Sequence, residues 1–229
     1  MIEHKNAPLA VMTGGTGHIG SAIVKTLKKS GWRVAVLSST QSGDDIYKCD
    51  ITDQRAVASV VENIIQTSGQ IDACIHAAVA SMGKDKSESD LQMRVTLNGA
   101  QNLAAAALPH MKNGAAFIGI TTKLIESGTT PMPMGSYIPA KMALRNFLRI
   151  LAQNNEKKEI RVYAVAPGYI AGGLNEGVPQ AILEMLAKKT GAGMTNAEAV
   201  ADVVKTICND AAAYKPSSSI AIPGEVTAL

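Results

Sequence analysis

The chain has 229 residues, of which 46% are hydrophobic and 18% are charged. This length is typical of a single domain with a sizeable core, and the composition excludes a disordered protein. The 22 basic and 19 acidic side chains leave a net charge of +3, and the lysines are scattered along the sequence. With only 3% aromatic residues, the chain has no composition suited to a nucleic-acid or membrane partner.

The cysteines indicate a reducing compartment. Cys49, Cys74 and Cys208 are odd in number, far apart and without CxxC spacing, so they are expected to be free thiols. The polar start, residues 1–8, leads directly into an apolar run and does not fit a signal peptide. No apolar run approaches the roughly 20 residues of a membrane-spanning helix. We expect a cytoplasmic protein.

The first recognisable unit covers residues 8–31. An apolar run at 9–12 predicts a buried strand, and residues 13–20 form the glycine-rich turn TGGTGHIG. Apolar residues then recur at helical spacing up to Gly31, which is placed as a helix C-cap. Glycines let a pyrophosphate approach the main chain, and the helix N-terminus offers unpaired N–H groups. The sequence therefore predicts dinucleotide contacts at Gly14, Thr16, Gly17, His18, Ile19 and Gly20.

The rest of the chain continues this alternation of strands and helices. Strands are predicted at residues 33–37, 46–49, 71–76, 115–120, 160–165 and 219–222. Helices are predicted at 53–67, from about 90 to 110, at 137–154, around 179–188, and after a capping box formed by Thr195 and Glu198. Such alternation predicts an α/β protein: one doubly wound parallel sheet of Rossmann type, with helices on both faces, in a single domain spanning 1–229.

The end of the second predicted strand bears on the choice of cofactor. An acidic residue there would bind the adenosine ribose of NAD, but this chain has Ser38 and Ser39. Their hydroxyls can donate to a 2′-phosphate and no carboxylate repels it, so the sequence favours NADP, with NAD still possible. After the third strand, Asp50 is either an acceptor for the adenine amino group or a turn residue.

A second pair of residues carries the predicted chemistry. Tyr137 and Lys141 are four residues apart at the start of a predicted helix, and therefore share one face. An ammonium beside a phenol favours the phenolate, so we expect a lowered pKa for Tyr137, which suits proton exchange with a carbonyl oxygen. The histidines of the chain have no spacing typical of a metal site, and no metal is predicted.

Together these residues resemble the short-chain dehydrogenase/reductase family, in its short single-domain branch. The resemblance covers nearly the full chain. It rests on TGGTGHIG, Asp50-Ile51, His76-Ala77-Ala78, Tyr137-x-x-x-Lys141, and the run Val165-Ala166-Pro167-Gly168-Tyr169-Ile170.

The resemblance implies a role for each matching segment. Tyr137 would be the acid/base, and Lys141 would also bind the nicotinamide ribose. The Pro167–Gly168 turn would hold the nicotinamide, and residues 169–194 would form a mobile substrate lid. The remaining cofactor contacts implied in this way are Ile51, Ala77, Ala78 and Ile170. Members of the family are often tetramers or dimers, so a homo-oligomer is expected.

The chain also departs from the family pattern. The usual serine is absent, and Thr122, after the fifth strand, is expected to orient the carbonyl in its place. Thr96 stands where the family has a helix asparagine, and His76 replaces another asparagine. With His18 in the place of a glycine, the turn has the G-x-x-G-x-x-G spacing of the epimerase-like branch.

The sequence thus predicts an NADP-dependent carbonyl or 3-oxoacyl reductase that transfers a hydride between the nicotinamide and a small ketone or alcohol. Two alternatives remain at this level. One is an epimerase- or dehydratase-like enzyme, suggested by the glycine spacing and His76. The other is a non-catalytic NADP-binding regulator, suggested by the altered serine and asparagine positions.

Overall fold

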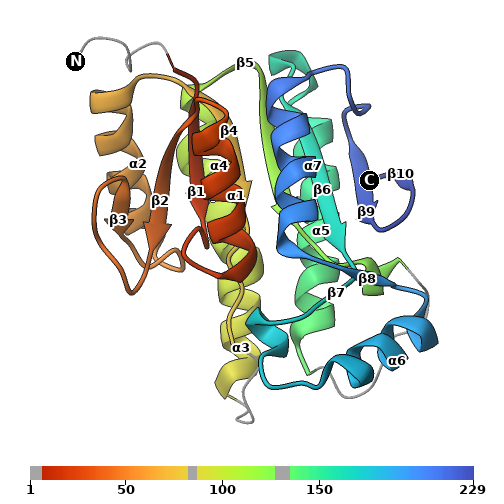
Figure 1. The fold of residues 1–229 in the computed structure, drawn as a ribbon. Helices are drawn as coiled ribbons and strands as arrows, with labels where there is room; N and C mark the ends of the chain where they lie inside the picture. Colours follow the sequence, from red (N-terminus) through yellow and green to blue (C-terminus); the bar gives the residue numbers. More distant parts are fainter. Residues whose placement is uncertain (1–6, 82–86, 127–134) are drawn as a thin grey trace.

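The computed structural model describes residues 7–81, 87–126 and 135–229. Its centre is an eight-stranded sheet with the order β10-β9-β6-β5-β4-β1-β2-β3, in which all neighbours are parallel except β10 and β9 (Figure 1). The strands of this sheet are β1 (Leu9–Thr13), β2 (Arg33–Ser38), β3 (Ile46–Lys48), β4 (Ile71–His76), β5 (Met111–Ile120), β6 (Arg161–Pro167), β9 (Ser218–Ile222) and β10 (Val226–Ala228). The predicted α/β fold with a mostly parallel sheet is confirmed.

Helices cover both faces of the sheet. The main helices are α1 (His18–Lys29), α2 (Gln54–Ser68), α3 (Ser87–Met93), α4 (Gly99–Ala107), α5 (Tyr137–Asn154), α6 (Gln180–Thr190) and α7 (Ala197–Asn209). In Figure 1, α1 and α7 lie in front of the sheet, and α2, α4 and α5 lie behind it. This arrangement follows from a residue pattern in which each helix has one apolar face and most strands are apolar on both sides.

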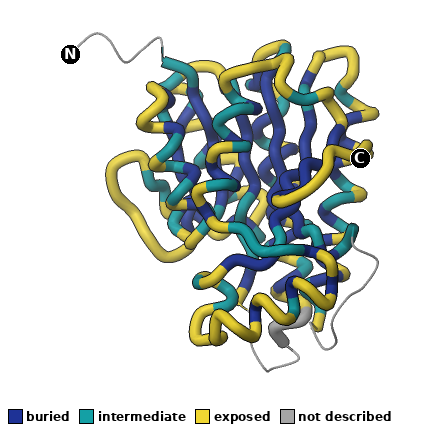
Figure 2. Tube along the Cα trace, turned by 45° about the vertical axis from the view of Figure 1, so that its right-hand side comes forward, coloured by how far each residue is buried: buried dark blue, intermediate teal, exposed yellow. Residues whose placement is uncertain are grey.

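Strand β1 shows how the two layers share the sheet. Leu9 and Val11 pack into the core on the side of α2, α4 and α5, whereas Ala10 and Met12 pack on the side of α1 and α7. Successive strand side chains point to opposite faces, so a continuous apolar run is what a strand covered on both faces requires. Figure 2 shows the buried residues concentrated along the central strands, with exposed residues on the outer surfaces of the helices.

The strand order reverses between β1 and β4, and this determines where a ligand can bind. Strands β2 and β3 follow β1 toward one edge of the sheet, and strands β5 and β6 follow β4 toward the other edge. The two strands are paired in parallel from Ala10 and Ala73 to Thr13 and His76. In such sheets the crevice beyond the carboxyl ends of these strands is the expected ligand site.

Several predicted boundaries are corrected by the structure. Helix α3 begins at Ser87 rather than near residue 90, and a π-helical turn (Arg94–Asn98) separates it from α4. Strand β5 begins four residues before the predicted 115–120, and β10 is an antiparallel strand that the sequence did not predict. The predicted capping box of Thr195 and Glu198 is wrong. The N-cap of α7 is Asn196, whose side chain accepts a hydrogen bond from the main-chain N–H of Ala199.

The region after β6 is more ordered than the predicted loop. It contains the short paired strands β7 (Tyr169–Ile170) and β8 (Met194–Thr195), with α6 between them. Leu183 and Ala187 of α6 form a small apolar cluster with Tyr169 and with Ile138 of α5. In Figure 1 this unit lies below the carboxyl ends of the strands.

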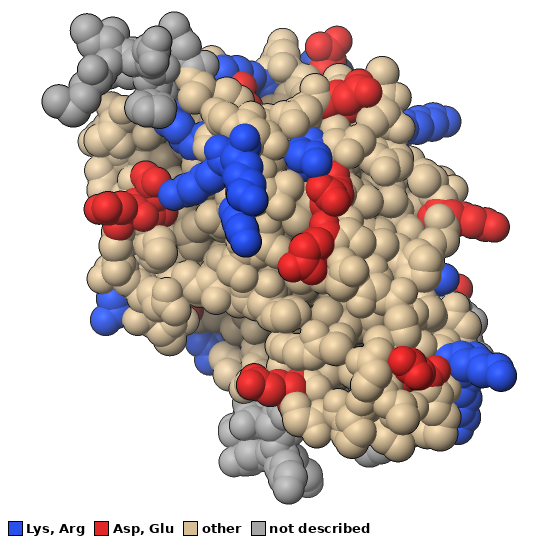
Figure 3. Space-filling model, in the orientation of Figure 1, with Lys and Arg blue, Asp and Glu red and all other residues tan. Residues whose placement is uncertain are grey.

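The surface carries charges of both signs. On the face shown in Figure 3, acidic and basic side chains are interspersed between broad uncharged areas. Among the described residues, no helix is long and apolar enough to cross a membrane.

Candidate active site

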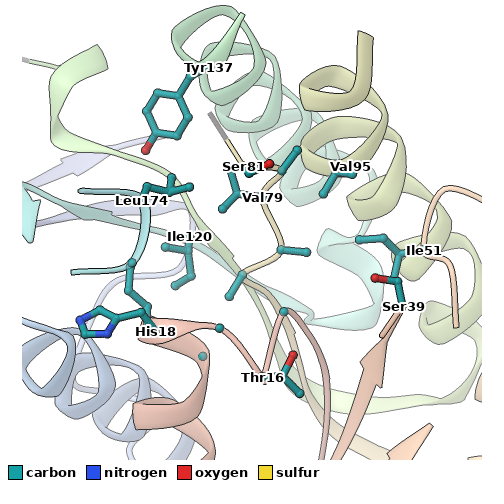
Figure 4. A pocket seen from close by; sticks show the side chains of 18 of the residues that line it. Thr16, His18, Ser39, Ile51, Val79, Ser81, Val95, Ile120, Tyr137 and Leu174 are labelled. Carbon is teal, nitrogen blue, oxygen red and sulfur yellow. The ribbon is translucent and has the colours of Figure 1, made fainter. Parts of the chain in front are cut away.

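A cavity of about 660 Å³ opens at the carboxyl ends of β1 and β4 (Figure 4). It is lined by every residue for which the sequence predicted a role in cofactor binding or catalysis. These are Gly14, Thr16, Gly17, His18, Ile19, Gly20, Ser38, Ser39, Asp50, Ile51, Ala77, Ala78, Thr122, Tyr137, Lys141, Pro167, Gly168 and Ile170. Segments from six different strand ends thus meet at one site, as the switch in strand order requires.

The glycine-rich turn is packed so closely that side chains are excluded. A Cβ at Gly14 would lie 2.5 Å from the main-chain nitrogen of Ala78, and Gly14 has φ of +72°. A Cβ at Gly20 would lie 2.0 Å from the carbonyl oxygen of Gly14. Gly17 is the N-cap of α1 and provides no side-chain cap, so the first N–H groups of the helix are left for a ligand. This cradle fits a diphosphate.

The opposite end of the cavity contains the hydroxyl groups after β2. Figure 4 shows Ser39 and Ile51 at this end, far from Tyr137. Ser38 is buried, and its Oγ accepts a 3.3 Å hydrogen bond from the main-chain N–H of Gln41. Ser39 is exposed at the edge of the cavity. The hydroxyl of Ser39 is therefore better placed than that of Ser38 to meet a ligand.

Carboxylates near this end are engaged elsewhere. Asp45 forms a 2.8 Å ion pair with Lys28 on α1 and is not among the lining residues. Asp50 does line the cavity, and its Oδ1 accepts from both the main-chain N–H and the hydroxyl of Thr52, at 2.9 and 2.8 Å. The turn role considered for Asp50 is present, and its free oxygen is left for a further donor.

Tyr137 and Lys141 lie together at the other end, at the start of α5. The Lys141 ammonium is 5.7 Å from the centroid of the Tyr137 ring and donates a 2.7 Å hydrogen bond to the carbonyl oxygen of Ile120. Desolvation lowers the pKa of Lys141 to about 7. Burial of this lysine thus weakens its positive charge near neutral pH.

The expected lowering of the Tyr137 pKa is wrong for the protein without its cofactor. Desolvation raises the pKa of Tyr137 to about 12, and a hydrogen bond with Thr122 opposes this in part. The physical reason is that desolvation of the phenolate outweighs the effect of an ammonium that is itself buried. The phenol is therefore protonated at neutral pH, which is the form that donates a proton.

Thr122, the residue expected to orient the carbonyl, lies beside Tyr137. It is buried, lines the cavity, and forms the hydrogen bond that acts on the phenol of Tyr137. Its hydroxyl also donates to the carbonyl oxygen of Pro167 at 3.4 Å and accepts from the main-chain N–H of Leu124 at 3.4 Å. Ser127 and Ser136 are the residues to which this role would move if Thr122 did not perform it; Ser127 lies outside the described residues.

Behind Lys141 lies a buried polar pair that does not line the cavity. His76 is fully buried, its Nδ1 is 2.8 Å from the hydroxyl of Thr13, and the main chain of Thr96 lies close enough to the ring to act on its pKa. Thr96, in the π-helical turn, is also fully buried with an unpaired hydroxyl. Desolvation, followed by the charge of Lys141, lowers the pKa of His76 to about 3. His76 is therefore neutral, and direct contact of its side chain with a ligand is not part of this geometry.

Apart from Leu174, which belongs to the predicted lid at residues 169–194, the side chains that surround Tyr137 were not predicted from the sequence. Val79, Ser81 and Val95 lie between Tyr137 and the end of the cavity at Ser39 in Figure 4, and Leu174 lies close to Tyr137. The further lining residues without a predicted role are Leu37, Thr40, Cys49, Thr52, Ala80, Leu91, Arg94, Ile120 and Thr121, while Gly173 and Asn175 belong to the predicted lid. Leu91 and Val95 are four residues apart, a spacing that could have predicted one apolar helix face.

The described residues contain no group of three or more His, Cys, Asp or Glu side chains placed to hold a metal ion. The cysteines are free, and burial raises the pKa of Cys49 to about 11 and that of Cys208 to about 12. Thiols with such pKa values are poor nucleophiles at neutral pH.

The chain is similar to known proteins over nearly its full length. Residues 15–224 match a family model described as enoyl-(acyl carrier protein) reductase. The cis-4-hydroxycyclohexanecarboxylate dehydrogenase of Sinomonas cyclohexanicum is 25% identical, over 96% of this chain and 97% of its own. The 3-oxoacyl-[acyl-carrier-protein] reductase of Pseudomonas aeruginosa is 27% identical, over 94% of this chain and 96% of its own.

Solved structures support the same fold. A short-chain dehydrogenase/reductase from Serratia marcescens superposes with a TM-score of 0.82 at 22% identity, covering 93% of this chain and 95% of that one. A short-chain dehydrogenase from Burkholderia cenocepacia, solved in complex with NADP, has a TM-score of 0.80 at 20% identity, with the same coverage. The chain belongs to the short-chain dehydrogenase/reductase family and is an NAD(P)-dependent oxidoreductase that acts on an alcohol or carbonyl group.

Proposed function

We propose that this protein is an NADP-dependent carbonyl reductase acting on a small ketone or a 3-oxoacyl group. The observation that carries the proposal is the single cavity that joins the glycine-rich turn and Ser39 to Tyr137, Lys141 and Thr122. When bound, the reduced nicotinamide supplies the hydride. The side chains of this protein would orient the carbonyl group, donate the proton and stabilise the phenolate that remains.

The cavity walls support binding of a dinucleotide in one direction. The diphosphate would lie at the N-terminus of α1, where Gly14 leaves room beside Ala78. The adenosine would lie between Ser39 and Ile51, and the nicotinamide toward Pro167–Gly168 and Tyr137. Lys141 has hydrogen-bonding capacity beyond Ile120 and would donate to the nicotinamide ribose.

The preference for NADP rests on the end of β2. Exposed Ser39 can donate to a 2′-phosphate, and the nearby carboxylate of Asp45 is paired with Lys28. No carboxylate among the described lining residues other than that of Asp50 would repel the phosphate, and Asp50 is held by Thr52. The choice is tested by comparing NADPH and NADH titrations of the purified protein, followed by fluorescence; equal affinities would remove this part of the proposal.

The proton in the reduction comes from Tyr137. The Thr122 hydroxyl has one hydrogen, which points to the Pro167 carbonyl in the free protein; it would turn from Pro167 to donate to the substrate carbonyl oxygen, and so hold that oxygen beside the phenol. The protonated phenol would then give its proton to the oxygen as negative charge develops there. Lys141, 5.7 Å from the ring centroid, would stabilise the phenolate that is left.

The substrate class follows from the neighbours of Tyr137. Val79, Val95 and Leu174 present apolar surface, and Ser81 adds one hydroxyl. Such a wall favours a compact apolar group beside the carbonyl. Two of the relatives are named as an acetoacetyl-CoA reductase and a 3-oxoacyl-[acyl-carrier-protein] reductase, which keeps 3-oxoacyl thioesters among the candidates. A screen of ketones and 3-oxoacyl thioesters for NADPH oxidation decides between them.

Of the two alternatives, neither gains a specific observation. The epimerase- or dehydratase-like alternative relied in part on His76, which is buried and does not line the cavity. The regulator alternative relied on the missing serine, whose place Thr122 takes beside Tyr137. NADPH binding without turnover across the whole substrate screen would favour the regulator.

We also infer that the protein forms a homo-oligomer. Met142 and Ile150, on α5, are 57% and 41% exposed, and lie eight residues apart. Residues at this spacing share a helix face, and exposed apolar faces favour association. Light scattering after size exclusion measures the mass directly; a monomer at micromolar concentration would rule this out.

A further inference from the structure

The side chain of His18 joins two walls of the cavity. His18 is the first residue of α1, and its imidazole packs on the main chain of Gly172 and Gly173. A Cβ at Gly172 would lie 3.1 Å from Cε1 and 3.4 Å from Nε2 of His18. At Gly173 it would lie 3.0 Å from Cβ and 3.4 Å from Cγ. The whole imidazole, from its base to its tip, therefore lies along these two glycines.

The backbone conformation of Gly172 and Gly173 and their contact with His18 both favour glycine at these positions. Gly172 has φ of +85° and Gly173 of +59°, a region that other residues rarely adopt. In addition, side chains there would meet the His18 ring. Conformation thus favours glycine at both positions, and a Cβ at either one would push the exposed His18 side chain aside by a few tenths of an ångström.

The segment that His18 contacts, residues 172–175, reaches the end of the cavity where Tyr137 lies. Gly173, Leu174 and Asn175 all line the cavity, and Leu174 lies near Tyr137 in Figure 4. The segment is a compact turn: the N–H of Asn175 donates to the Gly172 carbonyl at 3.1 Å, and Asn175 Nδ2 donates to the Ile170 carbonyl at 2.8 Å. Displacement of Gly172 would therefore move Leu174 and Asn175 with it.

His18 itself belongs to the glycine-rich turn, which lies on the other side of this contact. His18 follows the N-cap Gly17 directly, so its own N–H belongs to the first turn of α1, where the diphosphate would bind. The main chain of His18 and its side chain thus face different groups. The main chain faces the phosphate cradle, and the imidazole supports the segment that carries Leu174.

We propose that His18 is a positioning residue that holds residues 172–175 against the substrate end of the cavity and couples this segment to cofactor binding at the glycine-rich turn. The coupling part rests on the proposed function, because it requires the diphosphate at α1. The positioning part concerns the free protein as well. Without the ring, two glycines that restrict their own backbone very little would lose the surface on which they pack.

The test compares three variants. His18→Ala removes the ring, His18→Phe keeps a flat ring of similar size, and Lys25→Ala changes an exposed residue of the same helix away from the contact. Amide hydrogen exchange of the free proteins is followed at Asn175, Glu176 and Val178, whose N–H groups are hydrogen-bonded within this turn. In His18→Ala these amides should exchange roughly tenfold faster, while His18→Phe and Lys25→Ala stay near wild type.

Repeating the exchange with NADPH tests the coupling: NADPH should slow exchange at these amides in the wild type and in His18→Phe, but not in His18→Ala. A kinetic readout then tests the effect on the substrate wall. With an accepted ketone, His18→Ala should raise KM for the ketone about tenfold and lower kcat by less, because the substrate wall is displaced while the proton donor remains. His18→Phe should keep KM near the wild-type value. Unchanged exchange and unchanged KM in His18→Ala would overturn the proposal. If the wild-type protein reduced no ketone, the proposed function would fail, while the exchange data would still decide the positioning role.

Discussion

The Lys141 ammonium lies 5.7 Å from the centroid of the Tyr137 ring, and its hydrogen bond goes to the Ile120 carbonyl rather than to the phenol. Lysine and tyrosine thus interact through space, across the position where a ribose would bind. Because burial raises the pKa of Tyr137 to about 12, the phenol is protonated at neutral pH in the free enzyme, and this is the form that can donate a proton.

Replacing Tyr137 with phenylalanine should abolish the chemistry and spare the cofactor site. A positioned general acid contributes about 10²- to 10⁴-fold to a rate, so Tyr137→Phe should lower kcat for ketone reduction by at least that range. NADPH titration should give an affinity close to wild type. Tyr214→Phe, which removes a hydroxyl remote from the cavity, serves as the control. Turnover near the wild-type rate in Tyr137→Phe would exclude it as the proton donor.

The Thr122 hydroxyl should matter more than its methyl group. Thr122→Val keeps the shape and removes the donor, and we expect kcat to fall by about a hundredfold or more, comparable to loss of one oxyanion donor. Thr122→Ser keeps the hydroxyl and should retain most of the activity. The two variants are compared at saturating NADPH. Equal rates for valine and threonine would transfer this role to Ser136 or to Ser127.

A carboxylate at the end of β2 should reverse the cofactor preference. Ser39→Asp places a negative charge where the 2′-phosphate is expected, so NADPH should bind at least about tenfold more weakly, and NADH should bind better through the ribose hydroxyls. Gln41→Asp introduces the same charge two residues later, outside the lining residues, and should have a smaller effect. Identical responses of the two variants would mean that net charge alone, and no specific phosphate contact, is being measured.

His76 should make the protein sensitive to acid. Its pKa in the folded state is about 3, below the ordinary value of 6.5, because the ring is buried and lies near Lys141. Between these pH values the unfolded chain binds a proton that the folded chain does not, so the free energy of unfolding falls as the pH drops from about 6.5 toward 3.

A variant without a titrating group isolates this effect. At pH 7.5, His76→Asn should be less stable than wild type, since it loses the contact with Thr13. The difference should shrink as the pH falls, because only the wild type has a buried imidazole to protonate. Urea unfolding at pH 7.5, 6.0 and 4.5 measures it. A difference that stays constant with pH would contradict the assigned burial of a neutral ring.

The sequence alone predicted the order of the main strands and helices and the residues around which the candidate site is built. The glycine spacing in residues 13–20, the hydroxyl groups after β2 and the spacing of Tyr137 and Lys141 are local patterns, and local patterns follow from chain geometry. The structure places all of these residues around one cavity. Their roles in binding and catalysis remain predictions for the experiments above.

Only the tertiary structure decided the electrostatics and the long-range contacts. Spacing indicated that Lys141 would lower the pKa of Tyr137, but the balance depends on how far each group is desolvated, which no local pattern contains. In the same way, His18 and Gly172 are far apart in the sequence and meet only because β1 and β6 end at the same edge of the sheet. Side-chain spacing determines which residues share a face, whereas burial and packing between distant segments depend on the whole fold.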